Sequence, residues 1–139
     1  MGEHVKPTIS IKNPYWISRH RYYELKHFCL QYPEWKKACL ILDERSKTAS
    51  VKIEKEPTTN EYSDPTAKFA LTKTYYEKRI KLIEDTVIET DEELASYILK
   101  AVTEGLSFSY LKAKLEIPCG RDMYYDRYRR FFWLLSKER

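Results

Sequence analysis

The residues best suited to chemistry lie near the C-terminus, where basic, acidic and phenolic side chains follow a helical spacing. Apolar and aromatic positions from Tyr124 to Leu135 are spaced 4, 3 and 4 residues apart, which predicts an inward stripe. The side chains left to solvent are Arg121, Asp122, Tyr125, Asp126, Arg129 and Arg130. Arginine can bond guanine edges or phosphates, aspartate can accept from cytosine N4, and tyrosine can reach a phosphate or a thymine methyl group. This combination predicts contacts with duplex DNA.

Three consecutive helices are expected to position these side chains. Thr90 with the three acidic residues after it predicts a capping box and a helix start, and Gly105 predicts the end of that helix. Ser107 is expected to cap a short helix, and a long basic helix is expected to continue to about Lys137. Helix, short helix, tight turn and long helix is the order of a helix-turn-helix, which we place at residues 91–137.

The N-terminal part predicts two further helices. Asn13 followed by Pro14 predicts a helix start, and this helix is expected to run to about Gln31. Pro33 is then expected to begin a second helix. Residues 1–45 are therefore predicted to form an N-terminal helical hairpin.

The middle of the chain predicts a linker and then a long helix. Residues 46–63 are rich in Thr, Ser, Lys and Glu and have no helical period, so we expect a linker there, with a short strand at 49–53 as the alternative. Asp64-Pro65 predicts another helix start, and apolar residues continue at helical spacing from Phe69 to Val87. The predicted fold is all-α, with residues 64–139 as a helical DNA-binding domain.

Composition and charge narrow the function classes. The 139 residues are 42% hydrophobic with only 3 glycines, which favours packed helices joined by short turns. The net charge of +4 divides into +3 for residues 1–45, −2 for residues 46–118 and +3 for residues 119–139. Basic ends and an acidic middle are compatible with a polyanionic partner.

Cysteine usage and apolar runs predict the compartment. The chain has three cysteines, an odd number, without a CxxC pair, and no apolar run suited to export or to crossing a membrane. We therefore expect a cytoplasmic protein that makes no membrane contact.

Residues 106–120, with the sequence LSFSYLKAKLEIPCG, resemble the promoter-reading helix-turn-helix of bacterial sigma factors, whose pattern is roughly LSYxEIAxxLGISxG. The chain departs from this pattern at Lys112, where the pattern has Ala, at Glu116, where it has Gly, and at Asp122, where it has an apolar residue. The wider span from Ser63 to Phe132 resembles the phage and prophage regulators called RinA and ArpU, through an SDPT helix start, the YILKAVTEG helix and the aromatic, arginine-rich last helix.

This resemblance covers about half of the chain and implies a function. It implies sequence-specific binding to double-stranded DNA and activation of phage late, packaging or lysis-related genes in a Gram-positive host, with bacterial RNA polymerase as a candidate partner. A small terminase subunit or another phage assembly factor is the first alternative. A protein-binding adaptor that does not touch DNA is the second.

Aromatic residues of the N-terminal part are candidates for contacting such a protein partner. They are Trp16, Tyr22, Tyr23 and Trp35, and aromatic anchors are typical of transient interfaces. The alternative is that they pack on the helix expected at 69–87. The sequence does not predict the oligomeric state.

Catalytic and metal-binding motifs are absent from the sequence. It contains no nucleophile motif, no Gly-rich phosphate loop and no HExxH, so we expect no catalytic residue, no cofactor and no enzymatic activity. His20 and His27 are seven residues apart, which does not place them on adjacent helical turns, so no metal site is expected.

Overall fold

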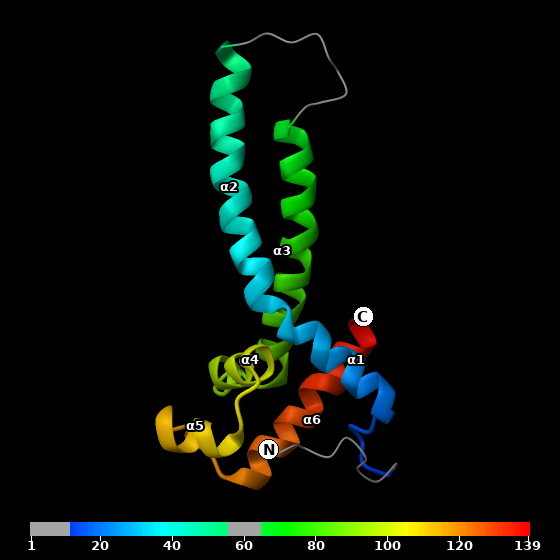
Figure 1. Cartoon of the computed structure of the whole chain (residues 1–139). Coiled ribbons are helices and arrows are strands. Elements are labelled where there is room, and N and C mark those ends of the chain that lie inside the picture. Colours follow the sequence, from blue (N-terminus) through cyan, green and yellow to red (C-terminus); the bar gives the residue numbers. More distant parts are fainter. Residues whose placement is uncertain (1–11, 56–64) are drawn as a thin grey trace. The chain divides into compact units, whose positions relative to one another are not determined.

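A computed structural model describes residues 12–55 and 65–139, which contain helices and no strand (Figure 1). The helices are α1 (Arg19–Leu30), α2 (Tyr32–Lys55), α3 (Pro65–Thr90), α4 (Ala95–Glu104), α5 (Phe108–Lys114) and α6 (Arg121–Glu138). This confirms the all-α prediction. No helix in the described ranges is both long enough and apolar enough to cross a membrane.

The described residues form two compact units. The core unit contains residues 12–32 and 82–139, and the two-helix unit contains residues 33–55 and 65–81. The chain therefore passes between the units within α2 and within α3.

The core unit is built where α1 packs against α4 and α6. Leu25 of α1, Ile98 of α4 and Phe131 of α6 have no exposed surface. Burying one such side chain stabilises a fold by about 1.5–3 kcal/mol. Since α1 and α6 are the first and last described helices, their shared core places N-terminal residues against the last helix.

The end of α4 follows its sequence signal. Gly105 has a left-handed φ of 72°, and its N–H donates to the carbonyl of Ala101, as does the N–H of Leu106. Only glycine adopts this conformation without a penalty, so the predicted stop is confirmed.

In the two-helix unit, α2 and the first half of α3 lie side by side and run in opposite directions (Figure 1). An ion pair joins them, because Nζ of Lys73 lies 2.6 Å from Oδ1 of Asp43. Among the described side chains of this unit, the buried apolar ones are Trp35 and Ile80.

The start of α1 differs from the prediction. Asn13 does not cap a helix but closes a turn, in which its side-chain oxygen accepts from the N–H of Tyr15 and its carbonyl accepts from the N–H of Trp16. Ser18 is the actual cap, and its hydroxyl accepts from the N–H of Arg21. Asn before Pro fits either a turn or a cap, and here the turn forms.

The predicted linker is wrong for residues 46–55, and so is the strand at 49–53, because α2 continues to Lys55. This stretch has no Gly or Pro before Pro57, and extending an existing helix needs no new nucleation. The rest of the predicted linker lies outside the described residues. The expected hairpin of residues 1–45 also does not form a unit, since α1 belongs to the core unit and residues 33–55 belong to the two-helix unit.

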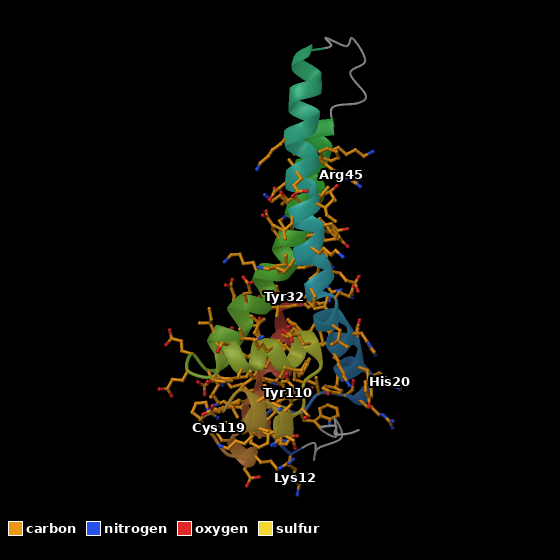
Figure 2. All side chains as sticks on the ribbon, turned by 60° about the vertical axis from the view of Figure 1, so that its left-hand side comes forward. Lys12, His20, Tyr32, Arg45, Tyr110 and Cys119 are labelled. Carbon is orange, nitrogen blue, oxygen red and sulfur yellow. The ribbon has the colours of Figure 1, made fainter. Side chains whose placement is uncertain are left out.

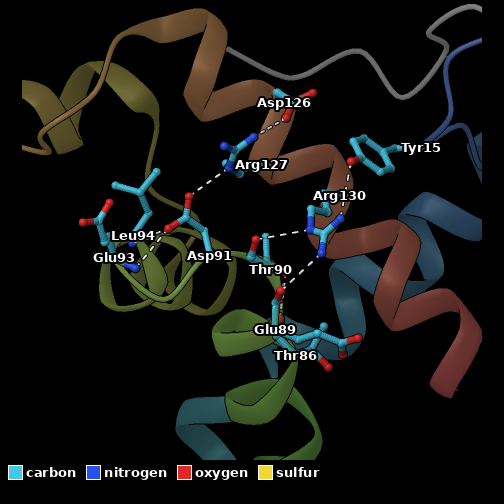
Figure 3. Close-up of polar contacts among 10 residues, drawn as sticks. All are labelled: Tyr15, Thr86, Glu89, Thr90, Asp91, Glu93, Leu94, Asp126, Arg127 and Arg130. Atoms are coloured by element: carbon cyan, nitrogen blue, oxygen red, sulfur yellow. Dashed lines mark hydrogen bonds and ion pairs between the residues drawn. The ribbon is translucent and has the colours of Figure 1, made fainter.

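The predicted capping box at Thr90 is wrong as well. Thr90 is the last residue of α3, and its hydroxyl donates to the carbonyl of Thr86. Instead, Oδ1 of Asp91 accepts from the N–H groups of Glu93 and Leu94 (Figure 3), and α4 begins only at Ala95. A carboxylate one residue later satisfies the N–H groups that the threonine was expected to satisfy.

Candidate nucleic-acid interface

The short helix α5 is fixed by one cap and two buried side chains. The hydroxyl of Ser107 accepts from the N–H of Tyr110 at 3.1 Å, which confirms the predicted cap. Phe108 and Leu111 are buried, whereas Tyr110 is exposed. The helix therefore has one face fixed in the core and one open face.

The turn after α5 contains the one non-glycine residue with positive φ in the described ranges, Glu116 at 55°. The next residue, Ile117, is buried, and its N–H donates to the carbonyl of Leu111. Nζ of Lys112 donates to the carbonyls of Ile117 and Cys119, at 3.2 and 3.3 Å. Hydrogen bonds back to α5 and a buried apolar anchor thus hold the turn in one conformation.

The inward stripe of α6 is present as predicted. Tyr124, Phe131 and Leu135 are buried, and the hydroxyl oxygens of Tyr128 and Tyr22 lie 2.9 Å apart and share a hydrogen bond. Burial raises the pKa of Tyr128 well above its ordinary value, so this phenol stays neutral at physiological pH. The stripe fixes the rotation of α6 about its axis.

The first turn of α6 is the most accessible part of the predicted DNA-contacting set. Arg121 and Asp122 are exposed, and no side chain caps the helix, because Gly120 stands at the capping position. The Arg121 guanidinium lies 5.4 Å from the ring centre of Phe108 and 5.7 Å from that of Tyr125, and no carboxylate of the described residues pairs with it. Its charge is therefore available to a ligand.

Tyr125 supports this region from a half-buried position. Its ring packs against Phe108 and Tyr124, with centroids 6.3 and 5.1 Å away. The ring of Tyr125 therefore lies where it helps to position Arg121, and its direct contact with DNA stays a prediction.

Asp126 is engaged in an internal charge network (Figure 3). The neighbouring Arg127 donates to Asp126 at 2.5 Å and to Oδ2 of Asp91 at 2.8 Å. Burial of Asp91 opposes its ionisation, but the hydrogen bonds from Arg127 and from the N–H groups of Leu94 and Glu93 outweigh it, so the pKa of Asp91 is lowered. This network ties α6 to the turn before α4.

Arg130, which was expected to face solvent, is used inside the protein. Its guanidinium donates to the carbonyls of Thr90 and Glu89, at 3.2 and 3.5 Å, and to the hydroxyl of Tyr15 at 3.4 Å (Figure 3). A cation at the last carbonyls of a helix satisfies groups that have no helical partner. Arg130 thus closes the C-terminus of α3 and is not free in solvent as expected, while its predicted contact with DNA stays a prediction. Arg129 is half-buried, and its Nε has no hydrogen-bond partner among the described residues.

The predicted partner-binding aromatics do not share one surface. Tyr22 is only 4% exposed and packs on Phe132 and Tyr128 of α6, and Trp35 is only 6% exposed. Packing inside the protein therefore explains Tyr22 and Trp35. Tyr22, however, packs on α6 and not on the helix expected at 69–87. Trp16 is exposed, and Tyr23 is half-buried, with Arg19 and Lys26 over its ring.

Two structural roles have no signal in the sequence. Lys112 departs from the sigma-like pattern, yet it holds the carbonyls of the turn. Arg127 pairs with Asp91, 36 residues away, and no spacing rule connects them. Only a folded chain reveals such pairs.

The structure offers no candidate metal centre, because the described residues contain no group of three or more His, Cys, Asp or Glu placed to hold an ion. No protein-family model, curated protein or solved structure matches the chain.

Proposed function

We propose that the chain is a non-catalytic transcription regulator that binds duplex DNA in a sequence-specific manner through α5, the following turn and α6, used as a helix-turn-helix. One observation carries the proposal. The turn needs a left-handed residue at Glu116, the position where the sigma-like pattern has glycine, and it leads into a long helix whose first turn is exposed. A turn of this kind sets the short helix and the long helix at a fixed angle.

The chemistry of the first turn of α6 suits a DNA groove. Uncapped N–H groups at a helix N-terminus carry partial positive charge and favour phosphate. Arg121 can donate two hydrogen bonds to O6 and N7 of guanine, and Asp122 can accept from N4 of cytosine. In this proposal Arg121 and Asp122 read bases, and Arg129 contacts a phosphate at the edge of the interface.

Two other charged residues of the predicted set, Asp126 and Arg130, form contacts within the protein. Arg130 holds the end of α3, and Asp126 pairs with Arg127. Arg130, and Arg127 through its bond to Asp91, keep α6 in place while its first turn faces the ligand, so the loss of these contacts would reduce stability more than sequence discrimination.

The proposal is tested with the full chain and a pool of random-sequence duplexes. Repeated selection should enrich one sequence, and Arg121→Ala should reduce discrimination between that sequence and a one-base variant by about 10- to 100-fold, the loss of one bidentate base contact. Lys100→Ala is the matched control, because Lys100 is an exposed cation of the same unit that pairs with Glu104. If no sequence is enriched, the proposal fails.

The resemblance to phage regulators adds a biological setting to the proposal. The selected sequence is expected upstream of phage late genes, and contact with bacterial RNA polymerase would make the protein an activator. A promoter reporter in a Gram-positive host distinguishes activation from repression.

A further inference from the structure

The positive charge of the chain is concentrated in the two-helix unit. Residues 33–55 and 65–81 contain 11 Lys or Arg and 5 Asp or Glu, a net charge of +6, and the three acidic residues of the segment 56–64 bring the whole span 33–81 to +3. Residues 12–32 and 82–139 contain 13 basic and 12 acidic residues, a net charge of +1. The proposed α5–α6 surface therefore lies in the nearly neutral unit, and the larger net positive charge belongs to the other unit.

The outward face of α3 is the clearest part of this basic surface. Lys68, Leu71, Tyr75, Lys78 and Arg79 recur at helical spacing on the side away from Phe69 and Ile80. Lys68 and Lys78 are exposed, as are Leu71 at 74% and Tyr75 at 51%. We call these five residues the α3 basic face.

Within the described part of α3, no acidic side chain forms an ion pair with a cation of the α3 basic face. The sequence contains no Asp or Glu from Pro65 to Tyr76, and Glu77 pairs with Lys73, the residue that also bonds Asp43 of α2. Two acidic residues of the unit, Asp43 and Glu77, thus pair with Lys73 and not with the α3 basic face.

Arg79 is held in place on this face. Its guanidinium lies 3.5 Å from the ring centre of Tyr75 and donates to the carbonyl of the same residue. An ordered cation loses less entropy when it contacts an anion. Long side chains also project from α2 in this unit, among them the exposed Arg45 (Figure 2).

We infer that the α3 basic face binds the phosphate backbone of duplex DNA without reading its sequence. Lys68 and Lys78 are ten residues apart, a rise of about 15 Å along the helix, so a single phosphate group cannot contact both. Duplex DNA presents phosphates continuously over such a distance. A lipid surface would require a broad apolar face, whereas this face has two large apolar side chains among cations.

This second surface goes beyond the proposed function, because it supplies affinity while the α5–α6 surface supplies discrimination. Sequence-independent phosphate contacts raise the affinity for every duplex equally and depend steeply on salt. The two surfaces can therefore be tested separately.

The test measures fluorescence anisotropy of a random-sequence duplex with the full chain across a salt titration. The triple variant Lys68→Gln, Lys78→Gln, Arg79→Gln is compared with the wild type. We expect the salt slope to fall by about two to three and the affinity at about 0.1 M salt to fall tenfold or more. These side chains lie on the surface, so an unchanged circular dichroism spectrum is expected.

A matched variant controls for net charge. Arg19→Gln, Lys26→Gln, Lys100→Gln removes three cations from the core unit, and it should change the affinity by less than about threefold, since it removes no phosphate contact. Equal losses in both triple variants would overturn the inference, as would wild-type protein that binds phosphatidylserine vesicles or an acidic peptide more tightly than the duplex.

Failure of this inference is distinguishable from failure of the proposed function. Loss of discrimination in Arg121→Ala with no effect of the α3 variant supports the α5–α6 surface alone and overturns the inference. Salt-dependent binding that needs the α3 basic face, without any enriched sequence, supports the inference and overturns the proposed function.

Discussion

Replacing Glu116 by glycine is expected to stabilise the protein, because the turn between α5 and α6 holds this residue at a φ of 55°. Residues with a Cβ atom pay about 1–2 kcal/mol in this left-handed region, whereas glycine adopts it freely. Glycine also loses about 0.5–1 kcal/mol more chain entropy on folding. Since Glu116 is exposed and has no ion pair among the described residues, the net gain should be about 0.5–1 kcal/mol.

Thermal unfolding followed by circular dichroism measures this gain. For a chain of this size, it should raise Tm by about 2–4 °C. Glu92→Gly is the matched control, because Glu92 is also an exposed glutamate in a turn but has an ordinary negative φ. The same substitution there should leave Tm unchanged or lower it.

The reverse substitution at Gly105 completes the comparison. Gly105→Ala places a Cβ 3.8 Å from Cδ2 of Leu30, an ordinary contact, so the loss of about 1 kcal/mol would come from the backbone at φ 72°. A lower Tm for Glu116→Gly, or equal effects of Glu116→Gly and Glu92→Gly, would refute the reasoning.

Three further predictions concern the core unit and its surroundings. Asp91→Asn should lower the free energy of unfolding at pH 7 by about 1–3 kcal/mol. Because the pKa of Asp91 is lower in the folded protein, the stabilisation by its carboxylate is present above about pH 4 and is lost as the pH falls through the folded pKa. Urea unfolding should therefore show a smaller difference between variant and wild type at acidic pH than at pH 7. Tyr22→Phe should cost about 1 kcal/mol, because it leaves the half-buried Tyr128 hydroxyl without its partner. Adding Tyr128→Phe should then cost less than Tyr128→Phe does in the wild type, and a double-mutant cycle measured by urea unfolding would show this coupling. Leu25→Ala should cost about 2–5 kcal/mol in the same assay, whereas Leu40→Ala, at a side chain that is 67% exposed, should change stability by less than about 0.5 kcal/mol.

The parts of the fold that the sequence predicts correctly depend on short-range signals. Gly105 ends α4 and Ser107 caps α5 through bonds to residues at most four positions away. The apolar stripe of α6 likewise follows from helical spacing alone. These features need no knowledge of the rest of the chain.

The parts that the sequence does not predict depend on residues far apart. Arg130 resembles a solvent-facing arginine in sequence, but the end of α3 lies beside it in the fold and offers unpaired carbonyls. Tyr22 is buried because α1 packs on α6, a helix about 100 residues later in the sequence. Local spacing contains no information on such contacts.

A count of charge by sequence segment also fails to indicate the α3 basic face. The apparently acidic segment 46–118 joins the basic start of α3 to the acidic stretch from Glu84 to Glu93. The structure divides these two stretches between different units, since the boundary falls after Lys81. The true partition of charge therefore follows from the fold and not from sequence order.

The central claim, that α5 and α6 contact DNA, is tested most directly by following the backbone amides of the isotope-labelled full chain during titration with the selected duplex by nuclear magnetic resonance. The proposal predicts the largest sequence-dependent shifts at Arg121, Asp122 and Tyr110, with small shifts at Lys100 on α4. Shifts that are equal for selected and random duplexes, or that are confined to helices other than α5 and α6, would contradict it.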